Sequence, residues 1–143
     1  MKPSHVLVPL DGSPLADDAL SHALAVFDCR ITVLNVVTPI DANISEGGVL
    51  EPSDQQQAEA QQRAERLVSR AQERVSGAAQ PTDTTVKTGD PAETILEFVE
   101  DTDIDHVVMG GHGGERRPLI RRVLGTVATK VVGEAPVTVT VVR

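Results

Sequence analysis

The sequence HVLVPLDGSP, residues 5–14, joins a short apolar run to a turn and then to the start of a helix. Residues 5–10 predict a buried strand, because parallel strands that are covered on both faces are almost continuously apolar. Residues 11–12 are typical of a turn, Ser13 is a good helix N-cap, and Pro14 suits the first helical position. The stretch therefore predicts a strand that leads directly into a helix, which is the repeating unit of an α/β fold.

The same alternation continues along the chain. Apolar or β-branched runs predict further strands over residues 31–37, 84–88, 105–109 and 137–142, of which 84–88 is the weakest and so belongs near a sheet edge. Helical periodicity and capping residues predict helices that begin at Pro14, near Asp54, at Pro91 and near Thr126. The apolar positions expected in the first helix are Leu15, Ala19, Leu20, Ala23, Leu24, Val26 and Phe27. This order implies one doubly wound α/β domain over residues 1–143, a parallel sheet with helices on both faces.

Composition and charge exclude several classes of protein. The net charge of −8 argues against nucleic-acid binding, which needs clustered lysines and arginines. An acidic surface with few lysines would suit a salt-rich cytoplasm, which we state as a hypothesis. The sequence shows neither a leader nor an apolar run near the ~18 residues of a membrane span, so we expect a soluble cytoplasmic protein without membrane contact.

The lone cysteine and two histidines are expected to be structural. Cys29 has no partner for an internal disulfide, and its place between a helix and a strand predicts a small buried hydrophobe. His5 and His106 lie near the starts of two strands that should be neighbours, at the end of the sheet opposite the candidate site. Because no third ligand is evident there, we predict core or rim histidines and no metal site.

Two glycine-containing segments favour an anion site. Residues 110–114, GGHGG, follow the strand 105–109 directly, and dense glycine lets a backbone approach a ligand and present N–H groups to an anion. Gly125 and Thr126 precede a helix, whose start is a second place for a phosphate. The arginines between these segments are Arg116, Arg117, Arg121 and Arg122. The alternative is a mobile loop with a solvated basic patch, and the pattern matches neither G-x-x-x-x-G-K-[ST] nor G-x-G-x-x-G.

Asp11 follows the first strand. If the first and fourth strands are neighbours at the switch point of a doubly wound sheet, Asp11 and residues 110–114 open on one crevice. A carboxylate there can bind ribose hydroxyls. It can also close an Asx-turn, and the two roles are compatible.

Taken in order, several runs resemble the universal stress protein family over essentially the whole chain. These runs are VPLDGS (8–13), LNVV (34–37), GDP (89–91), VVMGGHG (107–113), LGTV (124–127) and VTVVR (139–143). The resemblance implies a Rossmann-like fold of the adenine nucleotide alpha hydrolase-like type, with a five-stranded sheet of order 3-2-1-4-5. It also implies that ATP or AMP, with or without Mg²⁺, binds to Pro9, Asp11, Val36, Met109, Gly110, Gly113, Gly125, Thr126 and Val127. His112, Gly114, Arg116 and Arg117 are candidate phosphate contacts.

The spacing departs from the family's ATP-binding pattern, G-x2-G-x9-G-[ST]. Eleven residues, not nine, separate Gly113 from Gly125. The longer loop could still close, because added length costs little entropy, or it could displace the phosphate contacts.

The leading hypothesis is an ATP- or AMP-binding sensor or adaptor of the stress response, without strong catalysis. The resemblance also implies a homodimer through residues 137–142, since an apolar edge strand needs a partner. The alternative is a dimeric interaction module that does not bind nucleotide. Weak ATP hydrolysis assisted by Mg²⁺ is a third reading, and a lid role for residues 38–53 stays open.

Overall fold

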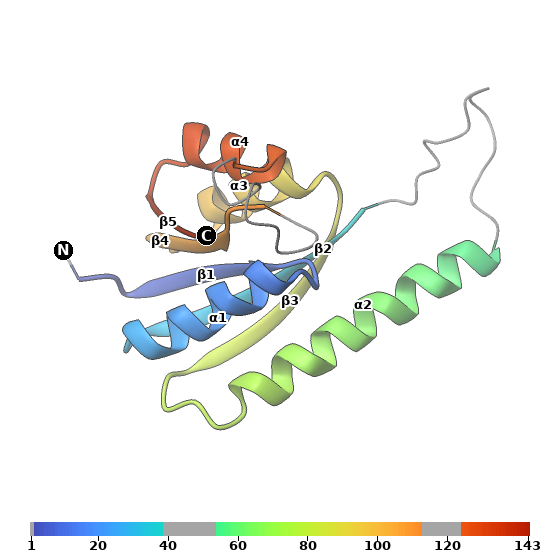
Figure 1. Ribbon diagram of the computed structural model, residues 1–143, viewed down its shortest axis with the longest axis horizontal. Coiled ribbons are helices and arrows are strands. Elements are labelled where there is room, and N and C mark those ends of the chain that lie inside the picture. The colour runs from blue at the N-terminus through green and yellow to red at the C-terminus, as the bar shows by residue number, and fades with distance from the viewer. Residues whose placement is uncertain (1, 39–53, 113–123) are drawn as a thin grey trace.

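The computed structural model describes residues 2–38, 54–112 and 124–143, in which strands and helices alternate (Figure 1). The elements are β1 His5–Leu10, α1 Pro14–Val26, β2 Arg30–Val37, α2 Asp54–Val75, β3 Thr82–Thr88, α3 Pro91–Asp101, β4 His106–Gly110, α4 Thr126–Glu134 and β5 Thr138–Val142. All strand pairs are parallel, and the order is β3-β2-β1-β4-β5. The predicted α/β class and the sheet order 3-2-1-4-5 are therefore confirmed.

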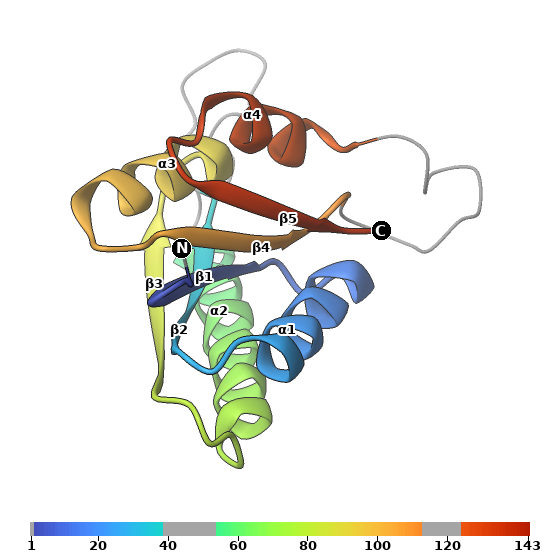
Figure 2. The ribbon, with the colours of Figure 1, turned by 90° about the vertical axis from the view of Figure 1, so that its left-hand side faces the viewer.

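Helices cover both faces of the sheet (Figure 2). Helices α1 and α2 pack on one face, where Val6 and Val8 of β1 belong to their core cluster. Helices α3 and α4 pack on the other face, where Leu7 of β1 joins theirs. Because successive side chains of a strand point to opposite faces, burial on both faces explains why β1 is apolar almost throughout.

The predicted cap at Ser13 is confirmed, and Asp90 caps α3 in the same way. The Ser13 hydroxyl accepts a hydrogen bond from the Ala16 N–H at 3.3 Å, and the Asp90 carboxylate accepts one from the Glu93 N–H at 3.0 Å. Each cap is followed by a proline at the first helical turn. These caps fix where α1 and α3 begin, just after the carboxyl ends of β1 and β3.

Some sequence expectations are corrected. Val26 was expected on the buried stripe of α1, but it is 56% exposed. Leu24 and Phe27 pack against the core at that end of the helix, which leaves Val26 on the solvent side. Boundaries also differ by one or two residues: β2 starts at Arg30, β3 starts at Thr82, β4 runs from His106 to Gly110 and β5 starts at Thr138.

Cys29 is partly buried against the core cluster beneath α1 and α2. Burial raises the pKa of its thiol. Since the thiolate is the reactive form, this environment fits the predicted packing role rather than a reactive one.

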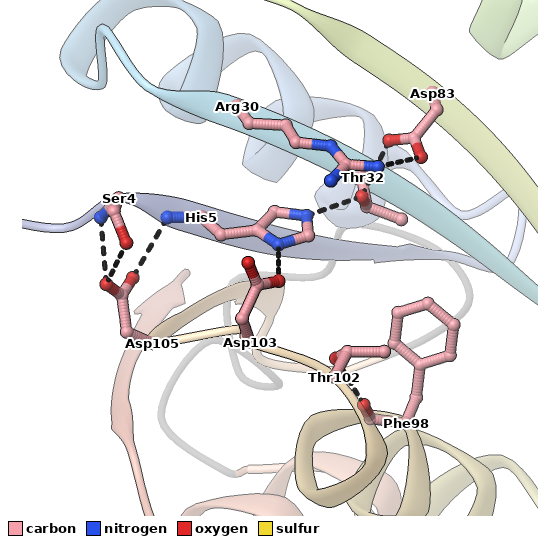
Figure 3. A network of polar contacts seen from close by, with 9 residues as sticks. All are labelled: Ser4, His5, Arg30, Thr32, Asp83, Phe98, Thr102, Asp103 and Asp105. Atoms are coloured by element: carbon pink, nitrogen blue, oxygen red, sulfur yellow. Dashed lines mark hydrogen bonds and ion pairs between the residues drawn. The ribbon is translucent and has the colours of Figure 1, made fainter.

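The amino ends of the strands carry a network of polar contacts (Figure 3). The ring of His5, a buried residue, lies with Nδ1 2.5 Å from the Asp103 carboxylate and with Nε2 2.7 Å from the Thr32 hydroxyl. The Thr32 hydroxyl donates to the Asp83 carboxylate at 2.7 Å, and Arg30 donates to the same carboxylate at 2.9 Å. The network ties β1, β2 and β3 to the segment that follows α3.

The network links a buried side chain to two carboxylates. The single Thr32 hydroxyl proton is donated to Asp83, so the Thr32 oxygen accepts from Nε2 of His5. The hydrogen bond from His5 and then its charge hold the pKa of Asp103 below its usual value.

His106 is also structural, as predicted. Its Nε2 lies 2.7 Å from the Thr140 hydroxyl of β5, and its ring centroid lies 4.8 Å from that of Phe27. Burial lowers the pKa of His106, while the Asp105 carboxylate opposes that shift.

Candidate functional site

A cavity of about 710 Å³ opens at the carboxyl ends of β1, β2 and β4. Strands β2 and β4 flank β1 on its two sides, so the chain leaves β1 and β4 in opposite directions. This is the switch point of a doubly wound sheet, where such folds bind ligands. The starts of α1, α3 and α4 complete the cavity, together with a stretch of α2 from Ala60 to Leu67.

The structure brings the described candidate residues together around this one cavity. The lining includes Pro9, Asp11, Val36, Met109, Gly110, His112, Gly125, Thr126 and Val127. Gly113, Gly114, Arg116 and Arg117 lie outside the described residues, as does the predicted loop beyond Thr38. Thr38 itself lines the cavity. Which ligand these residues contact stays a prediction.

Gly110 lets α1 lie directly against the end of β4. A Cβ atom at Gly110 would lie 2.9 Å from the backbone carbonyl carbon of Leu15 and 3.0 Å from the Ala16 nitrogen. Those atoms belong to the first turn of α1 and cannot move aside as a flexible side chain could. This glycine therefore sets the distance between the strand end and the helix start that together form one wall of the cavity.

The ends of the two glycine segments are joined. The Gly125 N–H donates to the Gly111 carbonyl at 2.6 Å, and the Gly111 N–H donates to the Val142 carbonyl at 2.8 Å. A Cβ atom at Gly125 would lie 3.1 Å from the Cα atom of His112. Relative to the family pattern, two residues are added between Gly113 and Gly125. Because Gly111 and Gly125 are hydrogen-bonded to each other, the added length does not hold the two glycine segments apart.

Helix α4 begins at the cavity without a side-chain cap. Its N-cap is Gly125, which makes no side-chain capping bond. The Gly125 N–H is already donated to Gly111, so the first-turn N–H groups of Thr126, Val127 and Ala128 are the ones available to an anion.

Asp11 closes the predicted turn and lines the cavity. Its Oδ1 accepts a hydrogen bond from the Ser13 N–H at 2.9 Å, which closes the turn between β1 and α1. The residue is exposed and lines the cavity, so its second carboxylate oxygen can receive a hydrogen bond from a ligand.

The backbone of Val36 faces the cavity because β1 is shorter than β2. The last residue of β1, Leu10, lies opposite Asn35. The Val37 carbonyl accepts from the Gly89 N–H at 3.0 Å and so faces the β3 side. Since backbone polar groups alternate sides along a strand, the Val36 carbonyl faces the β1 side, beyond the point where β1 ends.

Sequence reasoning missed Asn35 and Arg63, which also line the cavity. The Asn35 amide donates to the Leu10 carbonyl at 2.9 Å, and its Oδ1 is buried without a hydrogen-bond partner in the described part of the chain. Arg63 lies four residues before Leu67, one helical turn away on the same side of α2. That spacing was the available signal, but periodicity alone does not say which turn of a helix reaches a site.

The described ranges contain neither a cluster of metal-ligand side chains nor a membrane-spanning helix. Within residues 2–38, 54–112 and 124–143, no three His, Cys, Asp or Glu side chains gather into a possible metal site. Nor does any helix in those ranges have the length and apolar character needed to cross a membrane.

Comparison with known proteins identifies the family. The model of the universal stress protein family matches residues 3–143. A universal stress protein of Methanocaldococcus jannaschii is 30% identical over 96% of this chain and 81% of its own length. The chain therefore belongs to the universal stress protein family, as the sequence resemblance predicted.

Solved structures share the fold. The universal stress protein UspA from Lactobacillus plantarum has a TM-score of 0.74 at 21% identity, covering 100% of this chain and 99% of its own. A family member from Arabidopsis thaliana with AMP bound has a TM-score of 0.69 at 18% identity, covering 98% and 91%. The universal stress protein from Archaeoglobus fulgidus in complex with dAMP has a TM-score of 0.59 at 22% identity, covering 100% of both chains.

Proposed function

We propose that this universal stress protein binds an adenine nucleotide, ATP or AMP, in the cavity and acts as a nucleotide-dependent sensor or adaptor of the stress response. One observation carries the proposal: candidate residues from β1, β2, β4 and the start of α4 line a single cavity. Its volume of about 710 Å³ falls within the range typical of small-molecule sites. The A. thaliana and A. fulgidus relatives, solved with AMP and dAMP, support the choice of ligand.

Each part of the nucleotide has a matching part of the cavity. In this proposal the base packs against Pro9 and Met109, which both line the cavity, with its polar edge toward the Val36 carbonyl. The ribose hydroxyls donate to Asp11. The phosphate oxygens accept hydrogen bonds from the free N–H groups of the first turn of α4, where the helix dipole favours negative charge.

The proposed role is binding rather than strong catalysis, with Mg²⁺ accompanying ATP when ATP is the ligand. We also propose a cytoplasmic homodimer that pairs through β5. This strand is an edge of the sheet, and an unpaired apolar edge favours addition of a second chain. Light scattering at micromolar concentration tests the dimer, and a monomeric mass would contradict it.

The binding proposal is tested with Gly125→Arg. A Cβ at this position already lies 3.1 Å from the His112 Cα atom, so a long side chain must enter the cavity or displace its rim. Gly77→Arg is the matched control, because nothing lies within 4 Å of a Cβ atom at Gly77. Purified protein is acid-precipitated to detect released nucleotide, and nucleotide-free protein is titrated calorimetrically with ATP and AMP.

We expect wild type and Gly77→Arg to bind, and Gly125→Arg to bind at least tenfold more weakly while keeping its circular dichroism spectrum. No bound nucleotide and no heat from the wild type would leave the alternative, a dimeric interaction module of the same fold.

A further inference from the structure

We propose that Arg63 of α2 binds the phosphate-bearing end of the ligand, so that the cavity selects phosphorylated nucleotides over nucleosides. The inference rests on the proposed nucleotide binding and adds a residue from an element that sequence reasoning did not connect with the site.

The placement of Arg63 follows from the contact between α2 and the β1–α1 turn. Leu67 places its Cδ2 atom 3.0 Å from the position of a Cβ atom at Gly12, directly over that turn. Residues four apart share one face of a helix, so Arg63 lies one turn beyond Leu67 on the same side. Helix α2 continues past the carboxyl ends of the strands (Figure 1), and Arg63 lines the cavity there.

Arg63 differs from the other arginines on this side of α2. Arg70 and Arg74 each form an ion pair with Asp17 of α1 at 3.3 Å. Arg63 precedes Arg70 by seven residues, about 10 Å along the helix axis. Because α1 begins only at Pro14, no turn of α1 lies opposite Arg63. Among the described residues, no ion pair or hydrogen bond to its guanidinium is found.

The charges of the cavity favour a phosphate as its partner. Asp11 is the one carboxylate and Arg63 the one guanidinium among the described lining residues. A phosphate bound near Asp11 alone would be repelled, whereas a guanidinium offers paired N–H donors with a geometry that fits phosphate oxygens. The first turn of α4 approaches the cavity from the opposite face of the sheet. The cavity thus has donors to a phosphate on two of its walls, Arg63 of α2 and the first turn of α4.

The test compares AMP with adenosine, which lacks the phosphate. Both are titrated calorimetrically into nucleotide-free wild type, Arg63→Gln, Arg63→Lys and Arg66→Gln. Arg66 is the matched control, because it is exposed on the same helix and does not line the cavity. Replacing Arg66 by glutamine changes the net charge as much as replacing Arg63 by glutamine does. Thermal melts show that each variant is folded.

We expect Arg63→Gln to lower AMP affinity about tenfold and to leave adenosine affinity unchanged. Arg63→Lys should retain part of the AMP affinity, and Arg66→Gln should match the wild type. Equal AMP affinity in Arg63→Gln and wild type, or an equal loss for adenosine, would overturn the role of Arg63. Absence of AMP binding by the wild type itself would instead overturn the proposed function.

Discussion

Replacing Thr32 by valine tests the polar network at the amino ends of the strands. Valine has nearly the shape of threonine but lacks its hydroxyl, which bonds both His5 and Asp83 at 2.7 Å. Thr32 is 1% exposed and His5 is 5% exposed, so water cannot replace the bond between them, whereas the Asp83 side chain is 43% exposed and water can replace its bond in part. The change leaves the buried ring of His5 with an unpaired nitrogen, and removes from Asp83 the bond that joins it to β2 through Thr32.

The expected loss of stability follows from these contacts. Leaving the buried His5 nitrogen unpaired costs about 1–3 kcal/mol, the loss of the half-exposed bond to Asp83 adds about 1 kcal/mol, and an added apolar methyl returns about 1 kcal/mol. We therefore expect Thr32→Val to lower the free energy of unfolding by about 2 kcal/mol. Thr32→Ser, the control, keeps the hydroxyl and loses one buried methyl, which costs about 1 kcal/mol.

Urea unfolding of nucleotide-free protein at pH 7, followed by circular dichroism, measures both changes. The m-value should stay constant, so that the shift in midpoint reports stability alone. The network interpretation predicts that serine is tolerated better than valine, although valine is the more hydrophobic residue. It is refuted if Thr32→Val lies within about 0.5 kcal/mol of the wild type, or if serine is the more destabilising change.

Two further predictions concern packing and pH. Gly110→Ala should destabilise the protein by about 1–3 kcal/mol in thermal melts, because its Cβ would lie 2.9 Å from the backbone of α1, whereas Gly133→Ala, with nothing within 4 Å, should not; equal melting temperatures would contradict the proposed spacing. Burial alone would raise the pKa of Asp105. Hydrogen bonds from Ser4 and His5 together outweigh burial and lower the pKa. A carboxyl whose pKa is lower in the folded state adds stability above its unfolded pKa of about 3.9 and loses it as the pH falls further. Asp105→Asn should therefore flatten the loss of stability below about pH 4 in urea unfolding at stepped pH, and an unchanged acid slope would refute this.

The fold could be predicted from sequence because its signals are local. The run from His5 to Ser13 contains a strand, a turn and a cap within ten residues, and similar signals recur along the chain. The strand order came from resemblance rather than periodicity, since no local pattern states which strands are neighbours. Val26 shows the limit of periodicity, which marks a helix face but not where the packed neighbours on that face end.

The candidate site could be predicted in part for a geometric reason. Asp11, Gly110 and Gly125 all follow or precede elements at the carboxyl edge of a parallel sheet, where such residues must gather. Arg63 and Asn35 lie inside regular elements, and only the tertiary packing of α2 and the early end of β1 place them at the cavity. The hydrogen bond between Gly111 and Gly125 likewise could not be predicted from the spacing of the glycines in the sequence.

The central claim is that an adenine nucleotide occupies the cavity at the carboxyl ends of the strands. An amide NMR titration of ¹⁵N-labelled, nucleotide-free protein with AMP tests it most directly. We predict saturable shifts at Val36, Gly110 and Thr126, with Thr32 at the opposite end of the sheet unchanged. No shifts at saturating AMP, or shifts confined to residues outside the cavity, would contradict it.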